Sequence, residues 1–418
     1  QLLPECAAAG WQPLTTRDRR VRIRYFADIR FPLERANGVQ TMETCHALAR
    51  RGHDVRLTVR PDTARPPRNP FTYYGLEPIP QLRIDQVAVP SNPAARRGVY
   101  LAQACWRAMG TAGADVVLTR DLTLATLIVR VPRAVRPALV YESHGYAPAV
   151  GDEQHALLSG ARSQRGIKRR RLEARERLVW LRADGYVTIT KGLAQELEQR
   201  FGPRPRLAIV PDGVRAASVT PDDAGAGRHS GTPLVAAYAG HLYPWKGVDV
   251  FLHALHQLPH VHGLIVGGLD GEPDVTRVRA LADLLAPGRV VCAGLVDPPR
   301  VAPLLRQADV LVLPNLPTRI SAVYTSPLKL FEYMAAGRPI VASDLPALRE
   351  VLRPEENAIL VEAGNAGALA AAIERVAADP ALARRLARQA SMDAAGYTWE
   401  RRAERLEALL TEAAGRRA

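Results

Sequence analysis

The chain has 418 residues, of which 47% are hydrophobic, so its length predicts two domains of about 200 residues each and its composition argues against a disordered protein. No apolar run approaches the ~20 residues of a membrane-spanning helix. The four cysteines are scattered without paired or metal-ligand spacing, which favours a reducing cytoplasm and argues against structural zinc. The first residues show no signal-peptide pattern and no initiator methionine, so we expect a processed, cytoplasmic chain.

The formal net charge of +14 lies entirely in the N-terminal half. Residues 1–214 contain 34 Lys and Arg against 20 Asp and Glu, whereas residues 215–418 contain 22 of each class. Much of the excess falls in Arg162 to Arg182, where cations interleave with apolar residues such as Ile167 and Trp180. A basic, partly amphipathic helix here would suit an anionic membrane surface or a phosphorylated acceptor, and a solvated helix face is the alternative. Nucleic acid is not the expected partner, because an aromatic content of 6% offers few stacking platforms.

The N-terminal half predicts a parallel sheet covered by helices. Residues 1–20 lack periodicity and indicate a loose extension. Next we predict a β-loop-α-β unit. It consists of a strand at 21–26, a loop at 28–38, a helix at 39–51 that Gly52 ends, and a second strand at 54–59. The Pro-rich residues 61–80 indicate a loop. Further strands are predicted at 116–118, 138–141, 185–189 and 207–210.

The C-terminal half repeats this alternation after a linker at 216–232. Its strands are short, rich in Val, Ile and Leu, and bounded by Gly or Pro, as expected for parallel strands buried on both faces; the predicted ranges are 234–238, 263–266, 290–292, 310–313 and 340–342. The sequence therefore predicts two doubly wound α/β domains, 21–215 and 233–395, that face a central cleft. A C-terminal helix within 396–418 is expected to return to the first domain. Ligands of such sheets collect beyond the carboxyl ends of the strands.

Residues 324–343 predict a helix with both ends defined, followed by a buried strand. Ser326 is a suitable N-cap and Pro327 suits the first helical position. Gly337 and Pro339 end the helix.

Glu332 is the unusual residue of this helix, because it lies in an otherwise apolar segment. It falls about 8 Å below the helix start at 1.5 Å per residue. An anion held at the helix N-terminus would lie that far from its carboxylate, a spacing that matches a nucleoside diphosphate and its ribose hydroxyls. Pro327 has no N–H, so Leu328, Lys329 and the Ser326 hydroxyl would make the anion contacts. The alternative is a surface glutamate on an amphipathic helix.

Lys246 marks a second helix start in the same half. It belongs to a glycine-bounded loop, residues 240–247, between the strand at 234–238 and a helix beginning near Val248. A cation beside a helix N-terminus is well placed to meet phosphate, although most loop lysines simply face water. The second helix start in the same domain strengthens the phosphate interpretation.

These motifs together resemble the retaining glycosyltransferases of family 4, or glycosyl transferases group 1, which have the GT-B fold of two Rossmann-like domains. The resemblance covers nearly the whole chain after residue 20, and its motifs lie at 210–214, 240–247 and 326–337. It implies that a Gly-rich loop, here Asn37, Gly38 and Val39, approaches the donor phosphates. It also implies that His144, which follows the strand at 138–141, lies near the transferred sugar. A structural loop histidine is the alternative for His144.

The chain departs from the family pattern at two positions. His241 stands where the family often has Arg, so either Lys246 supplies more of the charge at the phosphate or His241 is protonated in the complex. Tyr324 stands where the family often has the first of two glutamates that are separated by seven intervening residues, the second being Glu332. Because that glutamate acts near the sugar hydroxyls, this departure affects the identity of the donor sugar more than the transfer itself.

The resemblance predicts a retaining transfer of sugar from a nucleoside-diphosphate sugar, UDP in preference to GDP, to a glycan, lipid-linked or small-molecule acceptor. The donor is a substrate, and no cofactor is expected. No Asp-x-Asp motif is present near the expected site, so Lys246 and the helix at Pro327 would neutralise the diphosphate without a metal. Glu332 would bind the ribose, and the backbone at Leu295 and Val296 would face the base. His144, Lys246 and Glu332 are the expected catalytic residues.

Two other functions stay open from the sequence. One is a sugar-nucleotide 2-epimerase on a similar fold, which needs acid and base carboxylates that the sequence does not place. The other is a non-enzymatic, basic surface-binding protein, which a wide separation of Lys246 and Glu332 would favour. If the chain is the enzyme, its basic half predicts a peripheral protein of the inner membrane face.

Overall fold

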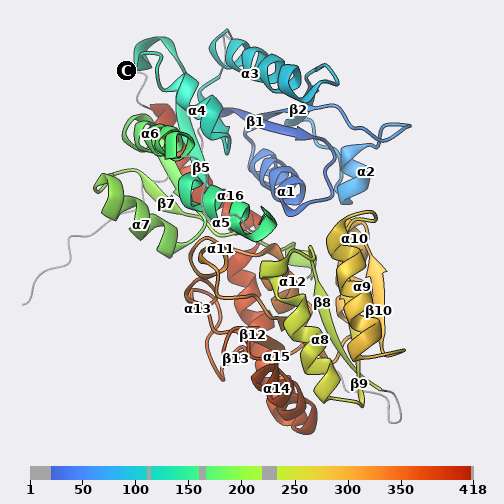
Figure 1. Ribbon diagram of the computed structural model, residues 1–418. Helices are drawn as coiled ribbons and strands as arrows, with labels where there is room; N and C mark the ends of the chain where they lie inside the picture. Colours follow the sequence, from blue (N-terminus) through green and yellow to red (C-terminus); the bar gives the residue numbers. More distant parts are fainter. Residues whose placement is uncertain (1–19, 111–113, 160–165, 219–232, 416–418) are drawn as a thin grey trace, which may run out of the picture.

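The computed structural model describes residues 20–110, 114–159, 166–218 and 233–415, which form two α/β domains. In Figure 1 the N-terminal domain, coloured blue to green, lies above the C-terminal domain, coloured yellow to red. Each domain contains one parallel sheet with helices on both faces. The predicted fold class is confirmed.

The N-terminal domain is built on a seven-stranded sheet with the order β3-β2-β1-β4-β5-β6-β7. Every pair of neighbours is parallel. The strands are β1 (Arg22–Arg30), β2 (Asp54–Arg60), β3 (Leu82–Gln86), β4 (Val116–Thr119), β5 (Ala138–Ser143), β6 (Gly185–Thr188) and β7 (Leu207–Ile209). Strands β4, β5 and β6 are buried along their whole length, as their Val- and Leu-rich sequences require in a sheet covered on both faces.

Alternate side chains of this sheet enter two separate cores. Val116 and Leu118 pack with α1 on one face, whereas Val117 packs with α3, α4 and α6 on the other, as the twofold period of a strand dictates. The helices of this domain are α1 (Ala36–Arg50), α2 (Pro70–Tyr74), α3 (Pro93–Met109), α4 (Leu122–Ile128), α5 (Ala147–Ser159), α6 (Gly166–Arg182) and α7 (Lys191–Phe201).

The C-terminal domain has a six-stranded parallel sheet with the order β10-β9-β8-β11-β12-β13. Its strands are β8 (Leu234–Ala239), β9 (Val261–Val266), β10 (Val290–Gly294), β11 (Val310–Leu313), β12 (Ile340–Ser343) and β13 (Ile359–Val361). Its helices are α8 (Val248–Gln257), α9 (Pro273–Leu285), α10 (Pro298–Leu305), α11 (Arg319–Val323), α12 (Leu328–Ala335), α13 (Pro346–Arg349), α14 (Ala366–Ala378) and α15 (Pro380–Ala394). Helices α8, α9 and α14 share one core, and α10 and α12 share the other.

The chain crosses between the domains twice, and the crossings lie side by side. Val214 pairs with Thr398, and a side chain at Gly213 would lie 3.0 Å from the Tyr397 carbonyl oxygen. Beyond this point α16 (Trp399–Ala414) returns to the N-terminal domain. Its residues Trp399, Ala403, Leu406, Leu409, Leu410 and Ala413 belong to the core that contains α1 and β1.

Two strands were not predicted, and each has a weak local pattern. Strand β3 lies at the sheet edge and has only one fully buried residue, while β13 has three residues. Helix α2 occupies part of the region predicted as a loop and begins at Asn69, whose side chain caps it. Helix α1 also begins three residues earlier than predicted.

Helix α6 differs from the predicted amphipathic helix. Val179 and Trp180 are buried in the protein core, and Leu178 is partly buried against it, so most of the apolar face is not available to a lipid surface. The exposed side presents Lys168, Arg169, Arg170, Arg171, Arg177 and Arg182, together with Ile167 and Leu181. Arg162 and Arg165 lie outside the described residues. No helix in the described ranges has the length and hydropathy of a membrane span.

Candidate active site

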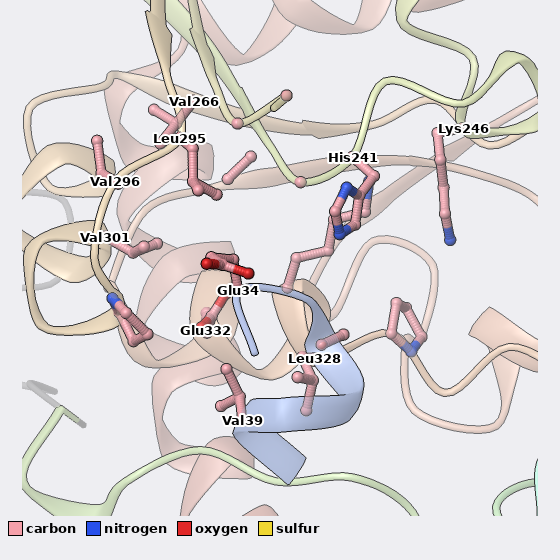
Figure 2. Close-up of a pocket in the computed structure, with 18 residues that line it drawn as sticks. Glu34, Val39, His241, Lys246, Val266, Leu295, Val296, Val301, Leu328 and Glu332 are labelled. Atoms are coloured by element: carbon pink, nitrogen blue, oxygen red, sulfur yellow. The ribbon is translucent and has the colours of Figure 1, made fainter. Parts of the chain in front are cut away.

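An open cavity, with about 910 Å³ of empty space that includes open solvent, lies between the two domains (Figure 2). The N-terminal domain contributes residues from the start of α1 and the loop before it, and the C-terminal domain contributes the loops that follow β8, β9 and β10 and the start of α12. The cavity therefore lies at the carboxyl ends of parallel strands, where such sheets bind ligands. Its lining residues are Glu34, Ala36, Val39, Ala239, Gly240, His241, Lys246, Val266, Gly267, Gly268, Leu295, Val296, Pro298, Val301, Pro327, Leu328, Lys329 and Glu332.

Lys246 reaches one end of the cavity from the loop that precedes α8. Gly247 caps this helix with a left-handed φ of 72°, and a side chain there would lie 1.7 Å from the Pro314 carbonyl oxygen, so the turn requires glycine. Burial lowers the pKa of Lys246 to about 8. A partly buried cation at a helix start is suited to an anionic ligand.

Lys329 is a second cation at this cavity. It is 7% exposed, and its Nζ has no hydrogen-bond partner among the described residues. The Nζ lies 3.9 Å from the centre of the Tyr238 ring, a cation–π distance. Burial, and then the charge of Lys246, lower the pKa of Lys329 well below its usual value. Two lysines whose charged forms are disfavoured by burial, and for Lys329 also by the neighbouring Lys246, form a site that a bound anion would stabilise.

Glu332 lines the same cavity from α12. Burial raises its pKa to about 7, with an opposing effect from Arg215 and a further increase from Glu43. Figure 2 shows Glu332 away from Lys246, toward the end of the cavity that Leu295 and Val296 line. The predicted residues Lys246, Leu328, Lys329, Glu332, Leu295 and Val296 therefore line one cavity.

The predicted cap of α12 is wrong. Pro327 is the N-cap, and no side chain caps this helix. The Ser326 hydroxyl instead accepts a hydrogen bond of 3.0 Å from the backbone N–H of Asp212. Ser326 therefore ties the helix start to the interdomain crossing and does not line the cavity.

The end of the cavity near Glu332 is largely apolar. Leu295 and Val296 follow β10, and Val301 lies on α10. Gly267 and Gly268 follow β9 with φ values of 124° and 89°, and a side chain at Gly267 would lie 2.2 Å from the Gly240 carbonyl oxygen. The sequence analysis missed this pair, although two glycines directly after a buried strand are a signal of close backbone approach.

Glu34 is a further cavity residue that the sequence analysis missed. It lies in the loop before α1, and its carboxylate accepts hydrogen bonds from Arg30 at 3.1 Å and from Arg68 at 2.7 Å. Burial disfavours its charge, but the bonds from Arg30, its own backbone and Arg68 outweigh this and lower its pKa. Glu34 is therefore a fixed anion on the wall opposite the C-terminal domain, and no local pattern marked it.

The predicted Gly-rich loop is instead the first turn of α1. Val39 lines the cavity, whereas Asn37 and Gly38 do not. Asn37 accepts a 2.7 Å hydrogen bond from Arg120. A side chain at Gly38 would lie 2.3 Å from the Leu33 carbonyl oxygen, so this glycine serves the packing of the preceding loop.

His241 lines the cavity. It stacks on Tyr243, with ring centres 5.2 Å apart. Burial, and then the charge of Arg35, lower its pKa. The lowered pKa disfavours a protonated His241 in the unliganded site, and the two lysines are the other cationic side chains of this wall.

His144 and Tyr324 are not among the residues that line this cavity. His144 follows β5, and its Nε2 lies 2.6 Å from the Glu142 carboxylate. The Tyr324 hydroxyl donates to Glu196 at 2.7 Å and accepts from Arg319 at 2.9 Å. The Tyr324 ring packs against Gly145, beside His144. Tyr324 is therefore a contact between the domains and does not line the predicted donor site.

Across the described ranges, no group of three or more His, Cys, Asp or Glu side chains is arranged to hold a metal ion.

Two family models match successive parts of the chain. Residues 37–213 match the glycosyl transferase 4-like domain, and residues 233–379 match the glycosyl transferases group 1 domain. The first match covers most of the N-terminal domain, and the second includes Lys246, Lys329 and Glu332.

Curated relatives align with part of the chain. A D-inositol 3-phosphate glycosyltransferase from Acidothermus cellulolyticus is 32% identical over 240 residues, which cover 53% of this chain and 52% of that protein. A protein of the same name from Nocardia farcinica is 28% identical over 287 residues, which cover 65% of this chain and 60% of that protein. The chain thus spans between half and three fifths of the length of these relatives.

Solved structures share the fold over nearly the whole chain. Sucrose-phosphate synthase from Thermosynechococcus elongatus has a TM-score of 0.75 at 23% identity, and the match covers 93% of this chain and 98% of that chain. Anabaena Alr3699/HepE, solved in complex with UDP-glucose, has a TM-score of 0.70 at 17% identity, with 94% and 100% covered. These likenesses confirm the GT-B fold.

Proposed function

We propose that this chain, which belongs to the glycosyl transferases of group 1 (family 4), transfers a sugar from a UDP-sugar to an acceptor hydroxyl with retention of configuration. The observation that supports this most is the convergence of Lys246, Lys329 and Glu332 on one cavity between the domains. A wide separation of Lys246 and Glu332 would have favoured a non-enzymatic basic protein, and the two residues line the same cavity.

The two lysines would hold the donor diphosphate. In the free site burial lowers the pKa of both, and a phosphate anion beside them would raise both again. Charged donors aimed at the leaving diphosphate stabilise the transition state as negative charge develops there. Binding of UDP near pH 8 should therefore take up protons from solution.

The apolar end would hold the nucleoside. Glu332 would accept hydrogen bonds from the ribose hydroxyls, and Leu295, Val296 and Val301 would cover the base. Anabaena HepE binds UDP and UDP-glucose, which supports UDP for this chain; GDP is the other candidate.

In the transfer the bond from the sugar C1 to the diphosphate oxygen breaks, and a bond from C1 to the acceptor oxygen forms. The acceptor proton passes to the departing phosphate oxygen, so no side-chain base is needed. His144 would accept a hydrogen bond from a hydroxyl of the transferred sugar, since it follows β5 at the carboxyl edge of the sheet and keeps 23% of its side chain exposed.

Contacts at the far side of the cleft support domain closure. Glu153 of α5 accepts hydrogen bonds from the backbone N–H groups of Arg319 and Ile320, at 2.7 and 2.6 Å. The Thr190 hydroxyl donates to the Val323 carbonyl oxygen at 2.7 Å. Closure of this kind excludes water from a reactive donor.

We further propose an acceptor that bears phosphate or is linked to lipid, reached at the inner membrane face by a cytoplasmic enzyme. The net positive charge of the N-terminal half and the exposed cations of α6 support this. The names of the curated relatives include a phosphorylated acceptor.

A donor screen tests the proposed function. UDP, UDP-glucose, UDP-galactose and UDP-N-acetylglucosamine should raise the melting temperature, and GDP-mannose should do so less. NMR of the product should show the anomeric configuration of the donor. Failure of every nucleotide sugar to stabilise the protein would overturn the proposal.

Chelation tests the proposed absence of a catalytic metal. Transfer should continue in EDTA, because the lysines supply the charge that a divalent ion would otherwise bring. Loss of transfer that magnesium or manganese restores would contradict this part of the mechanism.

A further inference from the structure

Arg402 of α16 is a buried cation at the base of the N-terminal site. Its side chain is 1% exposed. The guanidinium donates to Glu142 at 2.7 Å, to the carbonyl oxygens of Val210 and Pro211 at 2.8 and 2.9 Å, and to the Thr44 hydroxyl at 3.0 Å. A residue from the end of the chain therefore joins α1, β5 and the segment after β7, in a geometry that a lysine cannot reproduce.

Glu142 links Arg402 to His144. The same carboxylate oxygen that accepts from Arg402 also lies 2.6 Å from the His144 Nε2 and accepts from Gln40. Burial disfavours the charge of Glu142, but Arg402, His144 and Arg120 outweigh it and lower its pKa. Because an ionised carboxylate only accepts, the proton of a neutral His144 lies on Nε2 and leaves Nδ1 as an acceptor.

The charges around His144 keep its imidazole neutral. Burial, and then the charge of Arg120, lower the pKa of His144 to about 4, although Glu142 acts in the opposite direction. Arg402 adds to this effect. The titratable groups of the surrounding elements are Glu142 on β5, Arg120 after β4, Arg402 on α16, Asp212 after β7, Tyr25 on β1 and Cys45 on α1.

Asp212 does not cancel the positive charge of this cluster. Its carboxylate lies 3.8 Å from Arg402, and one of its oxygens is buried without a hydrogen-bond partner. Burial raises the pKa of Asp212 to about 6. Arg402 is thus the closest partner of Glu142 that carries a permanent charge, and its loss would leave Glu142 free to hold a protonated His144.

We propose that Arg402 is a positioning residue for the transfer: it fixes the Glu142 carboxylate, and Glu142 in turn orients His144 with Nδ1 as the acceptor. This proposal rests on the role of His144 in the proposed function. Helix α16, at the C-terminal end of the chain, therefore completes the acceptor-side site of the N-terminal domain.

The variants Arg402→Gln and Arg402→Lys test the proposal, with Arg401→Gln as the matched control. Arg401 is exposed on the same helix and pairs with Glu404. Arg402→Gln should lower kcat 10- to 100-fold while the donor KM changes less than twofold. In this variant the acid limb of kcat/KM should move up by at least one pH unit, because activity is lost as pH falls through the raised pKa of His144. Arg402→Lys should restore part of the loss, and Arg401→Gln should behave as wild type.

NMR of the wild-type protein provides a test that does not depend on the folding of a variant. The ¹⁵N shifts of His144, assigned by comparison with His144→Asn, should show the Nε2–H tautomer and no titration between pH 5.5 and 8. A titration near pH 6.5, or the Nδ1–H tautomer, would overturn the proposal. So would a folded Arg402→Gln enzyme that binds UDP and has the wild-type kcat and pH profile. Absence of UDP binding by the wild type would instead refute the proposed function.

Discussion

The two halves of this molecule build their sites in different ways. The donor site in the C-terminal half uses local features, since Lys246 and Lys329 both lie at helix starts. This half of the chain has equal numbers of acidic and basic residues. The acceptor half places His144 on a buried polar network that draws residues from distant segments. A site held by helix starts can be predicted from short motifs, whereas one held by long-range ion pairs cannot.

The largest expected difference between the halves concerns stability. Arg402→Met should lower the free energy of unfolding by about 3–5 kcal/mol, because it removes the arginine that forms an ion pair with the buried Glu142 carboxylate. Lys246→Met should leave the free energy of unfolding within about 0.5 kcal/mol of wild type or raise it, because burial already disfavours the charge of Lys246. Urea denaturation measures both values. If both variants lost a similar free energy of unfolding, the proposed difference between the ion-paired Arg402 and the unpaired Lys246 would be contradicted.

A second prediction concerns the surfaces of the two halves. The change of Lys168, Arg169, Arg170 and Arg171 together to Gln should weaken binding to anionic vesicles by about 3–4 kcal/mol, at about 1 kcal/mol for each cation. Neutral vesicles provide the control, and salt should release the wild type. The four-residue variant should bind UDP normally, because α6 lies outside the donor cavity. Equal wild-type binding to anionic and neutral vesicles would reduce these cations to a solvated helix face.

A smaller effect is expected from pH at the donor site. The pKa of Glu332 is raised to about 7 and that of Lys246 is lowered to about 8. UDP affinity should fall below pH 7 as Glu332 is protonated and above pH 8 as Lys246 loses its proton. Glu332→Gln should abolish the acid limb and weaken binding at pH 7.5 by about 1 kcal/mol. Calorimetry from pH 6 to 9 measures this, and a flat profile for the wild type would contradict it.

The sequence predicted correctly those features that depend on a short segment, such as a buried strand or the start of a helix. The buried strands of both sheets were predicted, but β3 was missed because its edge position tolerates polar residues, and β13 because three residues give too short a pattern. At the site, Lys246 and Lys329 were found from their positions at helix starts, and Glu332 was found as a charged residue in an otherwise apolar helix. Glu34 was missed because its position depends on Arg30 and Arg68, which the fold brings together.

Two of the wrong predictions have a common cause. Ser326 and Tyr324 were assigned to the donor site from their positions beside α12, but each has a stronger partner in another segment of the chain. Asp212 donates its backbone N–H to Ser326, and Glu196 accepts from the Tyr324 hydroxyl. A motif gives the location of a side chain along the chain, and tertiary contacts decide which way it points.

The most direct test of the account is the calorimetric titration of UDP into wild type and Lys246→Ala, with Lys191→Ala as a control on an exposed lysine. We predict that Lys246→Ala weakens UDP binding by about 1.5–3 kcal/mol, as expected for a hydrogen bond to a charged group, and that Lys191→Ala binds as wild type. Unchanged affinity in Lys246→Ala would contradict the assignment of the cavity between the domains as the donor site.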